Sequence, residues 1–374
     1  MHIVHVGADL EQQTTNGVNR VVALLARQQR ELGCDVTLVR FDGAHASETV
    51  DEETGIRICR LPMPGWPPSL SRETRDVFQR NCLRADLFHF HSAFVLPHNL
   101  VAHRVKAPYV VSPHGNYHSS ALMRSRWRKL AYRVLLDQRF LRNAAFLHVL
   151  TEDEASSIAA YGRARHVVVV PNPIEVVAPP RPDEREDARR ALGVGQELCL
   201  VFVGRLDVQQ KGLDLLIEGV RIARNDSRLR LLIAGPIAGR SDVRDLLRDE
   251  DRDSISVLPP VFDGERRRLL AAADYFVSPS RWEGQPTAVL EALAGGLPVL
   301  VTEATGLADF VRCHQAGLVT EPTPDAIAAS LRILAHTSPG QLGGPPTALA
   351  VQEQFGVRAI TEKLMSHYAA YVES

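Results

Sequence analysis

Short apolar runs alternate with longer segments of helical periodicity along nearly the whole chain. The predicted strands are residues 2–8, 35–41, 55–61, 86–92, 109–115, 145–150 and 166–172, followed by 198–204, 229–235, 254–260, 275–280 and 298–302. Several of these runs are almost continuous in Val, Leu and Ile, which is typical of strands buried on both faces of a parallel sheet. Helical patterns separate the strands, so the sequence predicts βαβ units and an α/β fold.

A segment rich in Pro and charged residues divides the pattern into two halves. A chain of 374 residues favours two domains. We place the linker near residues 174–184, with one doubly wound domain over 1–176 and a second over 184–355. The last segment, 356–374, has a helical pattern, and we expect it to pack back on the first domain. Ligands of such sheets bind beyond the carboxyl ends of the strands, so functional residues are expected in the loops that follow strands.

Two of these loops carry candidate chemistry. Arg205 and Lys211 lie between a predicted strand and a helix, where free N–H groups and cations suit a phosphate, although a solvated loop has the same composition. Glu283 lies in another such loop, and Glu291 lies eight positions later among Ala, Val and Leu. A carboxylate in apolar surroundings needs partners. A pair of ligand hydroxyls and a nearby Arg are both open as that partner.

Two further patterns have a plainer interpretation. His89 and His91 lie on the same side of a predicted strand. A metal pair is conceivable, but the sequence shows no third ligand nearby, so core or cleft-lining histidines are favoured. The D-x-D triplet at 251–253 lies in a polar run, and we interpret it as a solvated loop.

The segment 120–143 predicts a helix with two apolar stripes. Met123, Trp127, Leu130, Val134 and Leu141 form the stripe expected to face the core. The second stripe is Tyr132, Leu136 and Phe140, surrounded by Arg128, Lys129, Arg133 and Arg139. An apolar stripe ringed by cations is typical of a helix that lies on anionic lipid. A helix packed on both faces, or a basic face for a phosphorylated acceptor, would give the same pattern.

The composition limits which kinds of partner and which cellular location are expected. The formal net charge of −1 provides no global field for nucleic acid, so we expect no nucleic-acid partner. The five cysteines are scattered and show no C-x-x-C spacing, which favours a reducing compartment over a disulfide framework or a zinc site. The chain opens with a strand-like run and has no stretch of about 18 apolar residues. We expect a cytoplasmic protein, with attachment to a membrane only at its inner surface; the oligomeric state stays open.

Taken together, the motifs resemble those of the family 4 retaining glycosyltransferases, which have the two-domain GT-B fold with a cleft between two Rossmann-like domains. The E-x7-E pattern from Glu283 to Glu291 lies in "EGQPTAVLEALAGGLPV", and "GRLD" and "KG" occupy 204–207 and 211–212. "SPHG" at 112–115, "LTEDE" at 150–154, "VPNP" at 170–173 and "NG" at 16–17 follow the family in order. The helix after "SPHG" looks most like that of members that build bacterial exopolysaccharide or lipid-linked oligosaccharides.

The resemblance implies a role for each matching residue, with a nucleotide-diphosphate sugar as co-substrate and neither a cofactor nor a metal. Catalytic roles are implied for His114, Arg205, Lys211 and Glu283. The donor would be bound by Gly17, Arg205, Lys211, Glu283, Gly284, Gln285 and Glu291, with the diphosphate on the two cations, the sugar hydroxyls on Glu283 and the ribose on Glu291. The acceptor side would include Asn16, His91 and His114.

Departures from the family pattern leave the identity of the donor nucleotide sugar undetermined. "EGQP" stands where many members have "EGFG", and Asp309 stands where Glu is more usual. The expected reaction is retaining transfer to a lipid-linked glycan, brought to the cleft by a membrane-bound helix at 120–143. A soluble small-molecule acceptor, a GT-B sugar-nucleotide epimerase and a binding subunit without activity are the alternatives. A hydride-transfer enzyme is disfavoured because no G-x-G-x-x-G follows the first strand.

Overall fold

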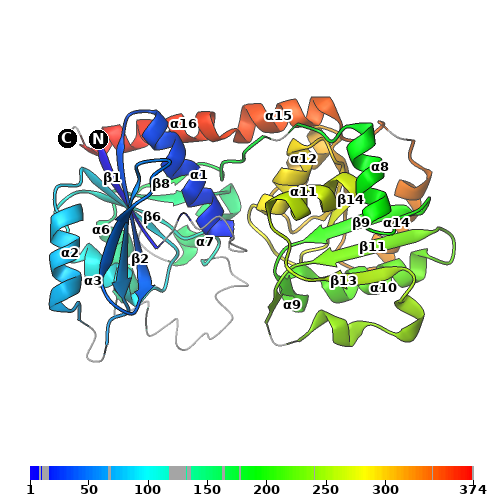
Figure 1. Ribbon diagram of the computed structural model, residues 1–374, viewed down its shortest axis with the longest axis horizontal. Helices are drawn as coiled ribbons and strands as arrows, with labels where there is room; N and C mark the ends of the chain where they lie inside the picture. Colours follow the sequence, from blue (N-terminus) through cyan, green and yellow to red (C-terminus); the bar gives the residue numbers. More distant parts are fainter. Residues whose placement is uncertain are drawn as a thin grey trace. The chain divides into compact units, whose positions relative to one another are not determined.

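A computed structural model of the chain describes residues 1–7, 10, 17–65, 69–117, 132, 136–161, 165–176, 178–239, 241–338 and 340–372. The chain forms two compact units (Figure 1). The N-terminal unit comprises most of the chain up to Pro173 together with the final segment from Val357, and the C-terminal unit comprises Ile174–Gly356. The chain therefore leaves the first unit at the "VPNP" motif and returns to it for its last helix.

The N-terminal unit is built on an eight-stranded sheet in the order β3-β4-β2-β1-β5-β6-β7-β8. The strands are β1 (His2–Val6), β2 (Asp35–Gly43), β3 (Ser47–Val50), β4 (Arg57–Pro62), β5 (Leu87–His91), β6 (Tyr109–Ser112), β7 (Phe146–Val149) and β8 (Val167–Val169). All pairs are parallel except β3 with β4. The sequence did not predict β3, because its residues SETV include only one apolar side chain and all four are exposed on an edge.

Helices bury both faces of this sheet. They are α1 (Gly17–Glu31), α2 (Arg72–Cys82), α3 (Leu96–Ala102), α6 (Gln138–Asn143), α7 (Glu152–Tyr161) and α16 (Val357–Val372). Along β1 the side chains alternate, so that Ile3 packs with residues of α1 and α16 while Val4 and Val6 pack in a separate cluster with α2. The C-terminal helix α16 lies against α1 (Figure 1), and its Tyr368 is fully buried.

The C-terminal unit contains a six-stranded, all-parallel sheet in the order β13-β11-β9-β14-β15-β16. These strands are β9 (Leu198–Val203), β11 (Leu229–Ala234), β13 (Ile255–Leu258), β14 (Tyr275–Ser278), β15 (Val299–Thr302) and β16 (Gly317–Thr320). The first strand, β9, is central, and the chain then builds outward first on one side and then on the other. The order of strands reverses between β9 and β14, which is where open α/β sheets bind ligands.

Ten short helical segments complete the described part of this unit, together with the small strands β10 (Leu206–Asp207) and β12 (Ile237–Ala238). They are α8 (Pro182–Ala191), α9 (Val208–Lys211), α10 (Leu213–Ala223), η2 (Val243–Leu246), η3 (Asp249–Asp251), α11 (Asp263–Ala272), α12 (Thr287–Ala294), α13 (Ala308–Cys313), α14 (Pro324–His336) and α15 (Pro345–Phe355). Alternate residues of β9 face two different apolar clusters. Burial on both faces explains the near-continuous apolar sequence of the strand.

The interpretation of the D-x-D triplet as a solvated loop is wrong at its first residue. Asp251 is only 1% exposed. Its carboxylate accepts hydrogen bonds from Arg221 and Arg224 of the α10 region and from the backbone of Arg248, and Arg221 above all holds its pKa below the ordinary value. This role could not be predicted from the sequence, because both arginines come from a helix about 30 residues earlier in the chain.

Most of the predicted helix at 120–143 lies outside the described residues. Of the four cations around its second stripe, only Arg139 is among the described residues. Leu141 is buried, as expected of the core stripe. Phe140 was expected on an exposed stripe, and this is wrong: it is buried and stacks on Tyr109, with ring centroids 5.5 Å apart. The Tyr132 hydroxyl, from the same expected stripe, donates to Asn99. No helix in the described part of the chain is long and apolar enough to cross a membrane.

Candidate functional site

The loops that follow β9 and β14 interlock at the point where the strand order reverses. The backbone N–H of Arg281, after β14, donates to the carbonyl of Gln210 in α9, at 2.9 Å. The guanidinium of Arg281 also makes two hydrogen bonds with the carboxylate of Asp214, at 2.8 and 2.7 Å. A third loop joins them, since Thr302 at the end of β15 donates to the carbonyl of Ser280. These contacts fix the backbone that carries the predicted donor residues.

Lys211 and Glu283 form an ion pair across this junction. Their side chains are only 11% and 15% exposed, so the pair is largely withdrawn from water. The second carboxylate oxygen of Glu283 accepts from the hydroxyl of Ser280 at 2.9 Å. The structure thus brings together two residues that lie 72 positions apart in the sequence, and it places a cation and an acid at the switch point.

Gly212 explains how Lys211 reaches this position. Its φ of +65° ends α9 and starts α10 in the left-handed region, which glycine adopts without strain. A Cβ at this residue would lie 2.1 Å from the carbonyl oxygen of Pro279. The glycine therefore allows the β9 loop to pack directly on the backbone of the β14 loop.

Glu291 lies in α12 with its carboxylate paired to Arg266 of α11. The two side chains are 12% and 17% exposed. Of the two partners that the sequence left open for this acid, the structure shows the arginine. One edge of the pair still reaches solvent, so the ion pair does not exclude ligand hydroxyls from the carboxylate.

The other predicted donor residues have varied surroundings. Arg205 lies two residues past the end of β9 and is exposed, with no ion pair to any residue of the described part of the chain. Gly284 is half-buried and open at its Cα, whereas Gln285 is buried. Pro286 immediately precedes α12. In the N-terminal unit, Gly17 begins α1, and Asn16 lies outside the described residues.

His114 follows β6 of the N-terminal unit in a strained backbone conformation. Its φ is +51°, and Ser92 and Phe94, after the neighbouring strand β5, also have positive φ. Such residues cost about 1–3 kcal/mol each and cluster at functional sites. The buried carboxylate of Glu154 holds the turn, because it accepts the N–H of Gly115 at 2.5 Å and that of Leu150 at 2.9 Å. Burial raises the pKa of Glu154, while these two hydrogen bonds oppose the shift.

The sequence did not predict that His114 ends a row of buried polar side chains. Both nitrogens of His91 are engaged: Nε2 contacts Nδ1 of His5 at 2.9 Å, and Nδ1 contacts Nε2 of His114 at 3.1 Å. His91 is 1% exposed and contacts His114, and its expected place on the acceptor side stays a prediction. Burial lowers the pKa of His5 to about 4 and that of His114 to about 3, so both rings are neutral near pH 7.

The fold brings a third histidine, His5, to His89 and His91. One nitrogen of each ring lies within 4.8 Å of the others, which is close enough for three ligands of a metal ion. Each of these nitrogens already has a hydrogen-bond partner, however. His89 contacts Ser112 and Tyr368, and His5 contacts Gln29 and His91. Neutral hydrogen-bonded imidazoles therefore account for the cluster.

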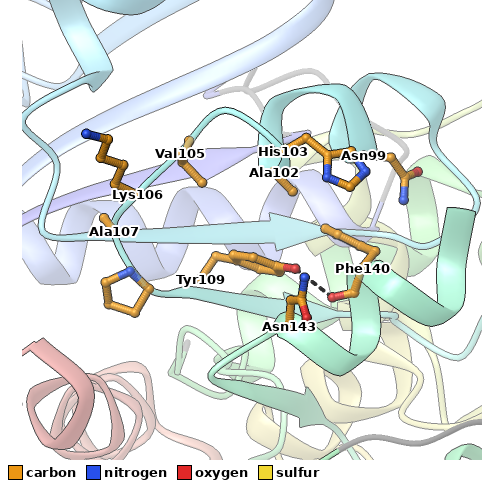
Figure 2. A pocket seen from close by; sticks show the side chains of 10 residues that line it. Asn99, Ala102, His103, Val105, Lys106, Ala107, Tyr109, Phe140 and Asn143 are labelled. Carbon is orange, nitrogen blue, oxygen red and sulfur yellow. Dashed lines mark hydrogen bonds between the residues drawn. The ribbon is translucent and has the colours of Figure 1, made fainter.

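A separate cavity of about 280 Å³ lies at the opposite end of β6 (Figure 2). Tyr109 and Phe140 form its wall, and the Tyr109 hydroxyl donates to the carbonyl of Phe140 at 2.7 Å. Lys106 and the amides of Asn99 and Asn143 contribute the polar part of its lining. Because it opens where β6 begins, this cavity is distinct from the strand ends that carry His114.

Two Rossmann-like units in one chain are the architecture of the GT-B class of glycosyltransferases. The description "Glycosyl transferase 4-like domain" matches residues 16–173, and "Glycosyl transferases group 1" matches residues 197–337. The two family models together match most of the chain. The chain belongs to family 4 of the glycosyltransferases, and the resemblance inferred from its motifs is confirmed.

Individual proteins and one solved structure are also similar to this chain. The chain is 27% identical over 263 residues to the Bacillus subtilis protein named as the teichuronic acid biosynthesis glycosyltransferase TuaC, covering 68% of this chain and 62% of that protein. It is 27% identical over 383 residues to a D-inositol 3-phosphate glycosyltransferase of Corynebacterium aurimucosum, covering 94% and 90%. Anabaena Alr3699/HepE, solved in complex with UDP and glucose, has the same fold with a TM-score of 0.79 at 17% identity, covering 98% of this chain and 99% of that chain.

Proposed function

We propose that the protein is a retaining glycosyltransferase that moves a sugar from a nucleoside-diphosphate sugar to a hydroxyl group of an acceptor. The observation that carries the proposal is the ion pair between Lys211 and Glu283, at the switch point of an all-parallel Rossmann sheet. Family membership supports the same reaction class.

The pair is suited to exchanging partners with a donor. A diphosphate that approaches Lys211 competes with Glu283 for the ammonium group. The released carboxylate then needs hydrogen-bond donors, because an unpaired buried acid is costly. Hydroxyls of the transferred sugar are such donors. The exposed Arg205 adds a second positive charge that no acid of the described residues neutralises.

In the proposed reaction the bond between the anomeric carbon and the diphosphate oxygen breaks, and the acceptor oxygen attacks the same face of the sugar. The acceptor proton passes to an oxygen of the leaving phosphate. Lys211 and Arg205 stabilise the charge that develops on the diphosphate, which is the largest single contribution in many enzymes. We propose that these cations serve in place of a divalent metal. Retention rests on the family resemblance.

UDP-sugars are the first donors to test, because the similar Anabaena protein was solved with UDP and glucose. Purified protein is incubated with UDP-, GDP- and ADP-sugars, and release of the nucleoside diphosphate is measured with and without EDTA. The configuration of the product is read by NMR. Turnover with retained configuration that survives EDTA supports the proposal. An inverted product, loss of activity in EDTA, or no turnover with any donor contradicts it.

The acceptor has two candidates. A lipid-linked glycan is proposed from the basic segment 120–143, and the relative TuaC is named for teichuronic acid biosynthesis. A soluble small-molecule acceptor is the alternative, because the burial of Phe140 removes one residue from the lipid-facing stripe and the corynebacterial relative is named for D-inositol 3-phosphate. We also propose a cytoplasmic location, because all five cysteines are free thiols and four are buried.

Vesicle co-sedimentation at low salt separates the two acceptors. Wild type should pellet with anionic vesicles, while a variant with Arg128, Arg133 and Arg139 changed to Glu should stay in solution. Neutral vesicles serve as the control. If wild type binds neither kind of vesicle, the acceptor is soluble, and inositol 3-phosphate becomes the first acceptor to test.

A further inference from the structure

Polar side chains form a continuous row across four neighbouring strands of the N-terminal unit. His5 of β1 is paired in register with His89 of β5, and His91 is paired with Ser112 of β6. His148 of β7 follows in the row, and its Nδ1 contacts the hydroxyl of Ser112 at 2.6 Å. Each of these five side chains is at most 1% exposed.

One carbonyl fixes the direction of the hydrogen bonds at one end of the row. The carbonyl oxygen of Val170 contacts Nε2 of His148 at 2.8 Å, and a carbonyl can only accept. Neutral His148 must therefore carry its proton on Nε2 and accept from Ser112 on Nδ1. The Ser112 oxygen in turn accepts from Nε2 of His89, at 2.6 Å. This leaves Nδ1 of His89 as an acceptor for the hydroxyl of Tyr368, also at 2.6 Å.

Gln29 sets the direction of the second half of the row. Its buried Nε2 makes no hydrogen bond within the described part of the chain, so the amide contacts the row through its oxygen. The amide oxygen of Gln29 faces Nε2 of His5 at 2.7 Å.

The same logic continues to His114. His5 donates from Nε2 to Gln29, so its Nδ1 accepts from Nε2 of His91. Nδ1 of His91 must then accept from Nε2 of His114. The proton of the neutral His114 ring thus points inward, and Nδ1 keeps its lone pair. Nδ1 of His114 has no partner in the described part of the chain and is not among the buried atoms left without a hydrogen bond.

We propose that Gln29 is a positioning residue that holds His114 in its Nε2–H tautomer, so that Nδ1 is presented to ligand as a hydrogen-bond acceptor. The group that it would recognise is a hydroxyl of a sugar, which can donate. This inference rests on the proposed function for its ligand, but the tautomer itself is a property of the free protein.

The test reads the tautomer directly. Protein labelled with ¹⁵N in histidine is studied at pH 7.5 by long-range ¹H–¹⁵N correlation, in which the two tautomers give different coupling patterns. A His114→Gln variant identifies the His114 signals. Wild type should show a protonated Nε2 and a bare Nδ1. A protonated Nδ1 in wild type overturns the proposal, whether or not any donor is turned over.

A variant and a matched control test the positioning role. Gln29→Met removes the hydrogen-bond acceptor of His5, so the two directions of the hydrogen bonds from His5 to His114 become similar in energy. The His114 signals should then move toward the average of the two tautomers. Gln28→Met makes the same change one residue away, on a side chain that is not part of the row, and should resemble wild type. An unchanged His114 tautomer in folded Gln29→Met protein overturns the proposal.

An effect on binding should accompany the effect on the tautomer. If half of the molecules hold the wrong tautomer, the competent fraction is halved, and the KM for a UDP-glucose donor should rise by about twofold at unchanged kcat. Absence of all turnover would reject the proposed function and leave the tautomer result standing.

Discussion

Acid should unfold the N-terminal unit well before it unfolds the C-terminal unit. His5, His98 and His148 are each no more than 2% exposed, and burial lowers the pKa of each from 6.5 to about 4. The unfolded chain therefore binds protons at these residues at a pH where the folded unit does not. Stability contributed by the neutral rings is complete above pH 6.5 and is lost as the pH falls from 6.5 toward 4.

The expected magnitude follows from these values. At pH 5 a histidine with a pKa of 6.5 unfolded and about 4 folded costs about 2 kcal/mol of stability. Three such residues cost about 6 kcal/mol together, and the lowered pKa values of His89 and His91 act in the same direction. A typical domain is stable by about 5–15 kcal/mol, so this loss is a large part of the total.

The assay is urea unfolding between pH 7.5 and 5, followed by circular dichroism. Hydrogen exchange of peptides from β5 and β9, corrected for the pH dependence of intrinsic exchange, locates the loss in one unit or the other. In a His98→Gln variant, the free energy of unfolding should depend less steeply on pH, by the contribution of one titrating group. His45→Gln, at an exposed position, should keep the wild-type slope. Equal unfolding midpoints at pH 7.5 and 5, or exchange that rises first in β9, would refute the reasoning.

Four further outcomes are expected. Lys211→Ala should lower kcat about a hundredfold or more because it removes charge stabilisation, while Glu291→Gln should mainly raise the donor KM; equal kcat losses at unchanged KM would contradict these roles. Glu154→Gln should lower the free energy of unfolding in urea by about 1–3 kcal/mol, because one backbone N–H loses its acceptor, and an unchanged midpoint would count against this. Asp251→Asn should lower the free energy of unfolding by about 3–5 kcal/mol and lower the Tm of the C-terminal unit; a Tm equal to that of wild type would contradict a structural role for this buried carboxylate. Glu283→Gln should bind UDP more tightly in calorimetry than wild type does, and weaker binding would reject competition for Lys211.

The sequence was most informative where burial alone sets the pattern. Strands such as β9 and β11 were predicted because both of their faces are buried, so the residue types carry the signal without knowledge of neighbours. The edge strand β3 lacked that signal because its side chains are exposed. The family was likewise predictable, because its motifs occur in order along the chain.

What the sequence could not supply was pairing between distant segments. His5 lies 84 positions before His89, and only the register of β1 with β5 makes them neighbours. The partners of Glu283 and Glu291 are cations on other elements, 72 and 25 positions away. Spacing predicts that two residues follow strands of the same sheet, but not which side chains meet there. The row that ends at His114 was missed for the same reason.

The pairing has a consequence for how the candidate site would use its charges. In the free protein, Lys211 is neutralised by Glu283 and Arg281 by Asp214, whereas Arg205 is exposed and has no ion pair with any residue that the structure describes. A nucleoside diphosphate alone would take Lys211 and leave the Glu283 carboxylate with only the Ser280 hydroxyl, at a cost for a group that is 15% exposed. A complete nucleotide sugar supplies hydroxyls to the same carboxylate. Under the proposed function, the ion pair would therefore favour the intact donor over its nucleotide product.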